Sequence, residues 1–250
     1  HGDLMKERIL ITGGDGFIGR NLAAVLSKEY DVLGTTHHDN NVSDKIFKFD
    51  LANPEIKKLP LDIDIFIHSA AISGVSNIYT PMDYFTVNTA GTMHVLEFCK
   101  RTNVKKFIYI STGGVYGYSP YKIREEYPCN PIDIYSLSKN LGEQLVAFYK
   151  DVFNILILRL FFPYGENQKG RLINKLILKV LNQESIFLNN CEGFPQINPI
   201  HVKDLCEIIF TLIVNNSNGI YNITSNEIIN IKNLYNIIFQ NMVIYKYCDM

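Results

Sequence analysis

The chain has 250 residues, with 24 Lys and Arg against 25 Asp and Glu, for a formal net charge of -1 at pH 7. This balance creates no field that would attract nucleic acid or an anionic membrane surface, so neither is expected as a partner. The five cysteines are scattered without a C-x-x-C pair, which is typical of free thiols in a reducing compartment. No apolar run approaches the roughly 18 residues that cross a bilayer. No charged-then-apolar leader opens the chain either, so we expect a cytoplasmic protein.

A glycine-rich turn stands near the start of the chain. Residues 8–12 form an apolar run that ends in Gly13-x-x-Gly16-x-x-Gly19, and the apolar residues of segment 21–26 recur at helical spacing. The pattern predicts a strand, a tight turn and a helix. Such a turn lets the backbone approach a pyrophosphate, which the N–H groups and the dipole of the helix N-terminus then bind. A glycine-rich turn without a ligand explains the triplet equally well, because short motifs of this kind also occur by chance.

The second predicted strand, residues 31–35, bears on the choice of dinucleotide. An acidic residue about 20 positions after such a glycine turn usually binds the adenosine ribose hydroxyls. Thr36 and His37 stand at that place, and the first carboxylate after them is Asp39. A neutral or weakly basic pocket suits a 2′-phosphate better than a carboxylate does, so the sequence favours NADP, with NAD as the alternative. A metal site at His37 and His38 is disfavoured, because adjacent residues on a strand diverge and no third ligand is evident.

Two further apolar runs end in polar or small residues. Residues 46–51 predict a third strand, whose Asp50 either contacts an adenine or caps the following turn. Residues 63–68 predict a buried parallel strand, and the small residues 69–71 after it leave room for a ligand. We expect His68 to be a hydrogen-bonded core histidine rather than a ligand.

A long helix and another strand follow. Residues 81–101 predict a helix with proline in its first turn and Asn88 in its middle. Asn88 is either a tolerated polar residue or one that faces a cofactor. Residues 106–111 predict a strand that leads into Thr112, and ligands bind at such carboxyl ends in parallel sheets.

Tyr135 and Lys139 stand four residues apart in a predicted helix that begins near Asp133. This spacing places both side chains on one helix face. An ammonium beside a phenol stabilises the phenolate and lowers the tyrosine pKa, which makes the phenol a usable general acid or base. An ordinary amphipathic helix explains the pair just as well when it is taken alone.

The regular alternation ends after the sixth apolar strand, residues 155–160. Beyond it the sequence predicts a helix at 172–181, a short strand at 186–188, helices at 202–214 and 231–242, and a strand at 219–223. Repeated alternation of strand and helix predicts an α/β fold, a doubly wound parallel (Rossmann-type) sheet with a small C-terminal substrate-binding lobe. We assign residues 5–160 to the dinucleotide-binding domain and 161–250 mainly to the lobe, with some segments returning to the main sheet. Residues 1–4 resemble a cloning remnant and are left out.

In its ordered set of motifs the chain resembles the extended short-chain dehydrogenase/reductase family, in particular its nucleotide-sugar epimerases, dehydratases and 4-ketoreductases. The resemblance covers nearly the whole chain. Its motifs are the glycine turn, Asp50-Leu51, residues 68–71, residues 87–92, Ser111-Thr112 with Val115-Tyr116-Gly117, Tyr135-x-x-Ser138-Lys139, Leu158-Arg159 with Tyr164-Gly165, residues 199–205 and residues 219–223.

The resemblance implies a role for each matching residue. Tyr135 would be the catalytic acid/base on the sugar oxygen, Thr112 would hydrogen-bond the same oxygen, and Lys139 would hold the ribose and lower the tyrosine pKa. Asn88 would support the active-site helix, and Asp50 the adenine. The implied cofactor site comprises Gly13, Gly16, Phe17, Ile18, Gly19, Thr36, His37, Asp50, Leu51, Ala70, Ala71, Asn88, Tyr135 and Lys139. The implied substrate is a nucleoside-diphosphate sugar, bound by Thr112 and by Arg171, although Arg171 fits a solvated helix start as well.

Departures from the family pattern narrow the reaction. Gly113 and Gly114 stand where the family's dehydratases carry Asp-Glu, and Gly114 also stands where its 3,5-epimerising members carry Cys. With dehydration and 3,5-epimerisation disfavoured, the remaining reaction is hydride transfer alone. It would be either the reduction of an NDP-4-keto-6-deoxysugar or a 4-epimerisation, and Thr36 with His37 favours the reductase. A non-enzymatic dinucleotide sensor is disfavoured, because Tyr135 and Lys139 are both present. The resemblance further implies a homodimer formed through the helices at 81–101 and 133–150.

Overall fold

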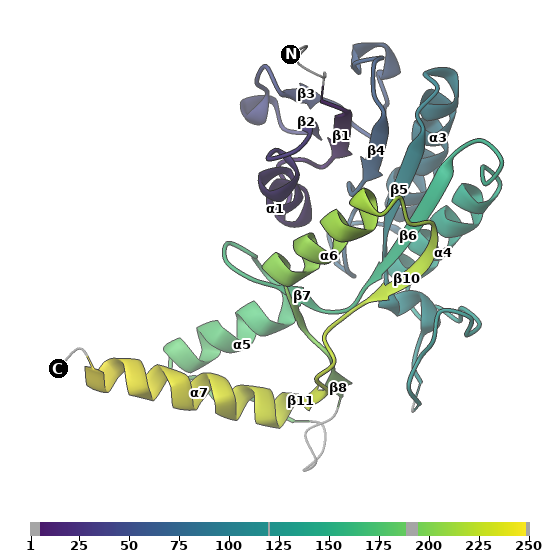
Figure 1. Cartoon of the computed structure of the whole chain (residues 1–250). Coiled ribbons are helices and arrows are strands. Elements are labelled where there is room, and N and C mark those ends of the chain that lie inside the picture. Colours follow the sequence, from purple (N-terminus) through teal and green to yellow (C-terminus); the bar gives the residue numbers. More distant parts are fainter. Residues whose placement is uncertain (1–5, 120, 189–194, 249–250) are drawn as a thin grey trace. The chain divides into compact units, whose positions relative to one another are not determined.

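The computed structural model describes residues 6–119, 121–188 and 195–248. Its main feature is a seven-stranded sheet with the strand order β10-β6-β5-β4-β1-β2-β3 (Figure 1). The pairings of β3 with β2, β2 with β1, β1 with β4, β4 with β5 and β5 with β6 are all parallel. The strands are β1 (Arg8–Thr12), β2 (Asp31–Thr36), β3 (Ile46–Lys48), β4 (Ile65–His68), β5 (Lys106–Thr112), β6 (Asn154–Leu160) and β10 (Gly219–Ile223). The predicted Rossmann-type fold is confirmed.

The central strands are mostly apolar because both faces of the sheet are covered. Every residue of β4 is buried, and Phe66 and Phe107 on β4 and β5 stack with ring centroids 5.8 Å apart. Val95 of α3 and Val146 of α4 belong to the same core. Strands that alternate with helices in this way produce near-continuous apolar runs. The helices are α1 (Phe17–Leu26), α2 (Pro81–Tyr84), α3 (Gly91–Arg101), α4 (Ile134–Ala147) and α6 (Val202–Val214).

The strand order reverses direction between β1 and β4. From β1 the chain moves outward through β2 to β3, and it then crosses to β4 on the other side of β1. In open α/β sheets, ligands bind outside the carboxyl ends of the strands at such a switch point. The residues that follow β1, β2, β4 and β5 are therefore those that position a site.

The helix predicted at residues 81–101 is continuous but not uniform. It begins at α2 behind a capping box formed by Thr80 and Asp83, passes through a π-helical turn at Phe85–Ala90 and ends as α3. A π-helical turn inside an α-helix commonly marks a functional site. Asn88 lies in this turn and is buried.

The chain divides into two compact units. The first comprises His1–Leu160 and Cys206–Asn222, and the second comprises Phe161–Leu205 and Ile223–Met250. The second unit contains a parallel pair, β7 (Pro163–Tyr164) with β9 (Ile200–His201), and an antiparallel pair, β8 (Gln196–Ile197) with β11 (Ile229–Asn230). It also contains α5 (Leu172–Leu181) and α7 (Ile231–Cys248).

The short strand predicted at residues 186–188 is wrong. The alternation that suggested it is real, since Ile186 and Leu188 pack against the core of the second unit while Phe187 is exposed. These residues nevertheless have no strand conformation in the structure. Alternation determines which side chains are buried, whereas a strand also requires a ladder partner for its backbone.

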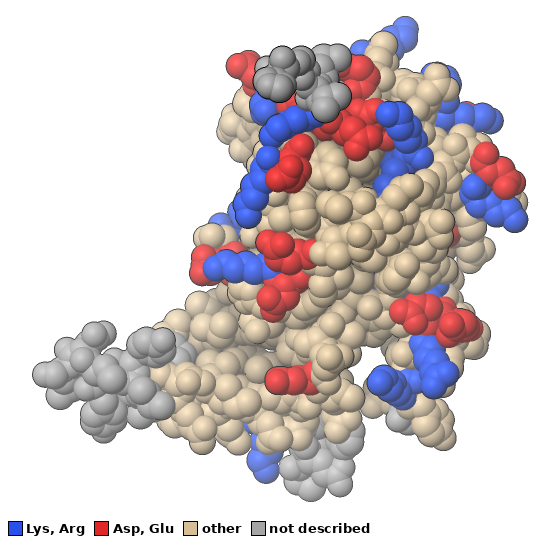
Figure 2. All heavy atoms as spheres, in the orientation of Figure 1, with Lys and Arg blue, Asp and Glu red and all other residues tan. Residues whose placement is uncertain are grey.

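Charged side chains of both signs are interspersed on the face shown in Figure 2. Partly exposed ion pairs lie near the amino ends of the sheet strands, where Arg8 contacts Asp31 at 2.8 Å and Lys105 contacts Asp64 at 2.7 Å. Within the described part of the chain, no helix combines the length and the apolar character needed to span a bilayer.

Candidate active site

The glycine turn after β1 excludes side chains at particular positions. Gly13 has a φ of +66°, and a Cβ on Gly19 would lie 2.1 Å from the carbonyl oxygen of Gly13. Gly16 precedes the first residue of α1 and supplies no side-chain cap to the first turn of that helix. The N–H groups at the start of α1 are thus left to an external acceptor. This backbone cradle fits a dinucleotide pyrophosphate.

The turn is joined to the end of β2, where the sequence places Thr36 and His37. Thr36 is buried and His37 is exposed. The Thr36 hydroxyl donates a hydrogen bond to a carboxylate oxygen of Asp15 at 2.6 Å. Sequence reasoning missed Asp15 because it looked for a carboxylate after β2, whereas this one comes from inside the glycine turn, 21 residues earlier.

His68, the last residue of β4, holds the ends of β1 and β4 together. Its Nδ1 lies 2.8 Å from the Thr12 hydroxyl and its Nε2 lies 3.0 Å from the Thr92 hydroxyl. Thr92 donates its own proton to the Asn88 carbonyl at 2.6 Å, so Nε2 is the protonated nitrogen and Nδ1 accepts from Thr12. Burial lowers the His68 pKa well below its usual value, and the nearby Lys139 charge lowers it further. The prediction of a hydrogen-bonded core histidine is confirmed.

Asn88 connects the loop after β4 to α4. Its side chain accepts from the Ile72 N–H at 2.8 Å and donates to the Ile72 carbonyl at 2.9 Å. It also donates to the Ser138 hydroxyl at 2.9 Å, and Ser138 donates in turn to the Tyr135 carbonyl at 2.7 Å. One amide in the π-helical turn thus fixes the loop after β4 at Ile72, next to the half-buried Ala70 and Ala71, and the first turn of α4.

Asp50 and Leu51 follow β3, which ends earlier than the sequence predicts. Asp50 is exposed, and its carboxylate accepts from the N–H of Ala52 at 2.9 Å. This contact matches the turn-capping alternative and leaves the other carboxylate oxygen for a ligand. Leu51 is buried against Gly91, where a Cβ would lie 2.9 Å from the Leu51 Cβ.

Thr112 ends β5 and begins a 3₁₀ turn at Gly113–Tyr116. Its hydroxyl accepts from the Gly114 N–H at 3.1 Å. A Cβ on Gly114 would lie 2.3 Å from the Ser136 hydroxyl and 3.5 Å from the Thr112 hydroxyl. The turn therefore packs against the start of α4 with no room for a side chain at Gly114.

Tyr135 and Lys139 lie on α4, which Asp133 caps by accepting from the Ser136 N–H at 2.8 Å. Tyr135 is half-buried and Lys139 is 1% exposed. The Lys139 ammonium lies 3.9 Å from the centre of the Tyr109 ring. Burial lowers the Lys139 pKa to about 7, and the Glu143 charge only partly offsets this effect. The amine can therefore change its charge near neutral pH.

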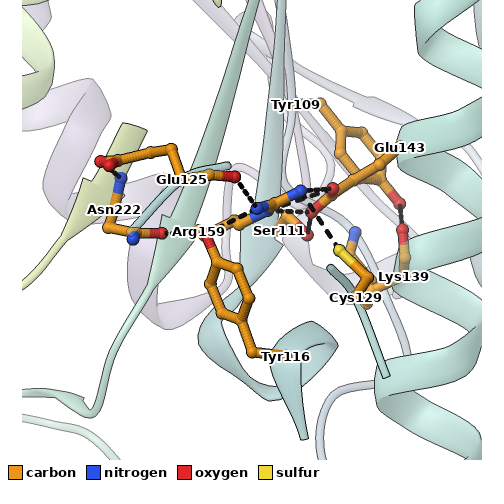
Figure 3. A network of polar contacts seen from close by, with 9 residues as sticks. All are labelled: Tyr109, Ser111, Tyr116, Glu125, Cys129, Lys139, Glu143, Arg159 and Asn222. Atoms are coloured by element: carbon orange, nitrogen blue, oxygen red, sulfur yellow. Dashed lines mark hydrogen bonds and ion pairs between the residues drawn. The ribbon is translucent and has the colours of Figure 1, made fainter. Parts of the chain in front are cut away.

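A buried polar network lies behind this helix (Figure 3). Arg159 of β6 forms an ion pair with Glu143 at 2.7 Å, one helical turn after Lys139. Arg159 also donates to the Tyr116 hydroxyl at 2.6 Å, and Ser111 donates a short hydrogen bond to Glu143. The network joins β5, the 3₁₀ turn, α4 and β6, which are the elements that carry Thr112, Tyr135 and Lys139. Sequence reasoning noted Arg159 only as a motif residue.

The second unit contains a hollow of its own. It is lined by residues that include Tyr164, Gln168, Asn174 and His201. Gln168 is buried, and among the described residues its Oε1 has no hydrogen-bond donor. Arg171 precedes the first residue of α5, is half-buried and does not line this hollow.

Comparison with known proteins gives the family. A model described as "NAD dependent epimerase/dehydratase family" matches residues 9–224. A "Putative UDP-glucose 4-epimerase" of Methanocaldococcus jannaschii is 31% identical over 92% of this chain and 81% of its own length. The GDP-6-deoxy-D-talose 4-dehydrogenase of Aggregatibacter actinomycetemcomitans is 32% identical over 82% and 70%. The UDP-glucuronic acid 4-epimerase of Bacillus cereus, solved with UDP-glucuronic acid and NAD, superposes with a TM-score of 0.79 at 30% identity, covering 90% of this chain and 80% of that one. The chain therefore belongs to the NAD-dependent epimerase/dehydratase family.

Proposed function

We propose that this chain is a nucleotide-sugar 4-epimerase that works with a bound NAD. Support comes from two relatives whose names specify 4-epimerisation of UDP-sugars, one of them solved with NAD. Thr36 and His37 favour a 4-ketoreductase that uses NADP when they are considered alone, but the Asp15 carboxylate beside Thr36 weakens that inference. The substrate class is a nucleoside-diphosphate sugar.

Three side chains of the first unit would carry the reaction. A dinucleotide held by the glycine turn and Lys139 would supply reversible hydride transfer at the sugar carbon. Tyr135 takes the proton from the sugar hydroxyl as the ketone forms and gives it back on reduction. Thr112 hydrogen-bonds the same oxygen, and charged Lys139 holds the ribose hydroxyls and lowers the Tyr135 pKa.

The observation that carries the proposal is the chemistry of the two residues after Thr112. A dehydratase of this family needs an acid and a base there, and Gly113 and Gly114 supply neither. A Cβ on Gly114 would lie 2.3 Å from the Ser136 hydroxyl, so a side chain there would require that hydroxyl to move. Elimination of water therefore lacks its proton donors and acceptors at these positions, and hydride transfer at C4 remains.

A 4-ketoreductase is the second candidate. One specific observation favours it, namely the 32% identity to a GDP-6-deoxy-D-talose 4-dehydrogenase, an enzyme whose name places a redox step at C4. It would need the same Thr112, Tyr135 and Lys139 but would exchange its dinucleotide on every turnover.

A label at C4 separates the two candidates. Purified protein is incubated with UDP-glucose or UDP-glucuronic acid deuterated at C4 and catalytic NAD, and the sugars are analysed by NMR. An epimerase yields the 4-epimer with deuterium retained and with no net change in nicotinamide absorbance. A reductase instead oxidises added NAD(P)H stoichiometrically with an NDP-4-keto-6-deoxysugar.

Tyr135→Phe provides the control on mechanism. It is expected to lower turnover about 100-fold or more, in the range of a lost general acid/base. Tyr121→Phe is the matched variant, since Tyr121 is 76% exposed, and it is expected to leave turnover unchanged. Full activity in Tyr135→Phe would refute the assigned role.

The assembly and the substrate contact remain proposals as well. Met82, Phe85 and Leu137 are exposed on the helices expected to form a homodimer, which supports that assembly. Arg171 is retained as a candidate contact to the substrate diphosphate.

A further inference from the structure

Asp15 brings a negative charge to the end of β2. It stands between Gly13 and Gly16, and it is half-buried. Its carboxylate oxygen accepts from the Thr36 hydroxyl at 2.6 Å and from the Asn41 amide at 2.7 Å. The end of β2 is where dinucleotide folds place the acidic residue that binds the adenosine ribose hydroxyls. This chain lacks such a residue in β2 itself but carries a carboxylate at the same place.

The loop does not need this carboxylate to stay attached to β2. The Gly14 N–H donates to the Thr35 carbonyl at 2.7 Å, and the Gly13 N–H contacts the Thr35 hydroxyl at 3.3 Å. Gly14 also packs so closely on Gly34 that a Cβ would lie 2.8 Å from the Gly34 Cα. These backbone contacts hold the turn, so the Asp15 charge is available for another role.

The donors that hold Asp15 are neutral, so its charge is not cancelled by them. A hydroxyl and an amide donate to it, whereas Lys48 of the neighbouring β3 forms an ion pair with Asp39. Burial raises the Asp15 pKa, but the hydrogen bonds from Thr36 and Asn41, together with a backbone hydrogen bond and the His38 charge, outweigh burial and keep the pKa below its usual value. The carboxylate is therefore ionised at neutral pH.

We infer that Asp15 is the residue by which this chain selects NAD over NADP. Its carboxylate would accept a hydrogen bond from the ribose 2′-hydroxyl of NAD and repel the 2′-phosphate of NADP. The inference rests on the proposed function only in assuming that the chain binds a dinucleotide. The selecting charge comes from the glycine turn, and Thr36 and Asn41 orient it.

Dinucleotide binding, measured without sugar, tests the inference. NAD⁺ and NADP⁺ are titrated separately by calorimetry into the wild-type chain, Asp15→Asn and Asp15→Ser. The wild-type chain is expected to bind NAD⁺ at least about 10-fold more tightly, because like charges in contact are strongly unfavourable. Both variants are expected to lower the ratio of the NADP⁺ dissociation constant to the NAD⁺ dissociation constant about 10-fold, chiefly by binding NADP⁺ better. Added salt is expected to lower the wild-type ratio, since ions screen the half-exposed charge.

Asp151→Asn is the matched control, because it removes one carboxylate that is exposed on the surface. Its ratio of dissociation constants is expected to equal that of the wild-type chain. An unchanged ratio in both Asp15 variants, a wild-type preference for NADP⁺ or a wild-type chain that binds neither dinucleotide would overturn the inference. A chain that selects NAD⁺ through Asp15 but epimerises no sugar would refute the proposed function and leave this inference standing.

Discussion

Two carboxylates of the first unit have opposite environments. Glu143 is buried in α4 and forms an ion pair with Arg159 at 2.7 Å, so that two charges cancel inside the protein. Asp15 is half-buried in the glycine turn and is held by the neutral donors Thr36 and Asn41. One carboxylate is satisfied by the protein alone, and the other keeps a net charge at the edge of the sheet.

This difference indicates a structural role for Glu143 and a ligand-binding role for Asp15. A buried charge must be paired, because an isolated one costs several kcal/mol of desolvation, roughly 3–5 kcal/mol when a partner is removed. Glu143 therefore serves to fix α4 and β6 relative to each other, and with them Lys139. A half-exposed carboxylate with neutral donors retains its charge for a ligand at little cost in stability. We expect substitutions of Glu143 or Arg159 to alter stability. Substitutions of Asp15 should instead alter dinucleotide binding.

Arg159→Met is expected to show the largest loss of stability. It leaves Glu143 buried without its cation, which should lower the free energy of unfolding by about 3–5 kcal/mol. Urea denaturation followed by circular dichroism measures the change. The double variant Glu143→Gln, Arg159→Met removes both charges and should recover more than half of the loss. Equal losses in the single and double variants would mean that packing, not charge, holds this region.

Lys139→Met should separate activity from stability. Loss of the ammonium removes the group proposed to hold the ribose and to assist Tyr135, so turnover should fall about 100-fold or more. The same change removes a buried charge while Met still packs on Tyr109, and it should stabilise the ligand-free protein by about 1–3 kcal/mol near pH 6.

The pH dependence of this gain follows from the Lys139 pKa of about 7. Between pH 7 and the ordinary lysine value near 10.5, the unfolded chain binds the proton and the folded chain does not, so wild-type stability rises with pH. The advantage of Lys139→Met should therefore be largest at and below pH 7 and smallest above pH 10. Thermal unfolding at pH 6 and pH 10 measures it, and an advantage that grows with pH would contradict the assigned burial effect.

Much of the main unit could be predicted from the sequence because its signals are local. The glycine turn, the apolar strands and the four-residue spacing of Tyr135 and Lys139 are each determined by neighbouring residues. The strand order then follows from the doubly wound topology. These features place the cradle and the catalytic helix at the same edge of the sheet.

The contacts that give the site its charge could not be predicted in this way. Asp15 meets Thr36 across 21 residues, and Glu143 meets Arg159 from a different element. The residues that directly follow β2 include no acidic residue at the expected distance from the glycine turn, but the fold brings the Asp15 carboxylate to the end of β2. The absent strand at 186–188 has a similar cause, because pairing depends on a partner elsewhere in the chain.

Gly114→Ala tests the close packing that joins the 3₁₀ turn to α4. The new Cβ would lie 2.3 Å from the Ser136 hydroxyl, so the turn or the helix must shift. Overpacking of this kind is expected to cost about 1–3 kcal/mol and to reduce kcat by moving Thr112 relative to Tyr135. The double variant Gly114→Ala, Ser136→Ala removes the clashing oxygen and should recover part of both losses. Wild-type kinetics in the single variant would show that the turn adapts freely.

Asp15→Asn and Glu143→Gln form the closing comparison, because each replaces one carboxylate by an isosteric amide. Asp15→Asn should change the free energy of unfolding by less than about 1 kcal/mol, the range of changes at half-exposed sites whose backbone contacts persist. The lowered Asp15 pKa means that its contribution is present above the unfolded-state pKa and is lost as the pH falls, so even this difference should vanish in acid. Glu143→Gln leaves Arg159 buried without an anion and should be several-fold more destabilising. Urea titrations of the two variants at pH 7, and at a pH well below the ordinary aspartate pKa of 3.8, measure both effects. Equal destabilisation would show that the charge at Asp15 is structural and would remove the distinction between the Asp15 and Glu143 carboxylates.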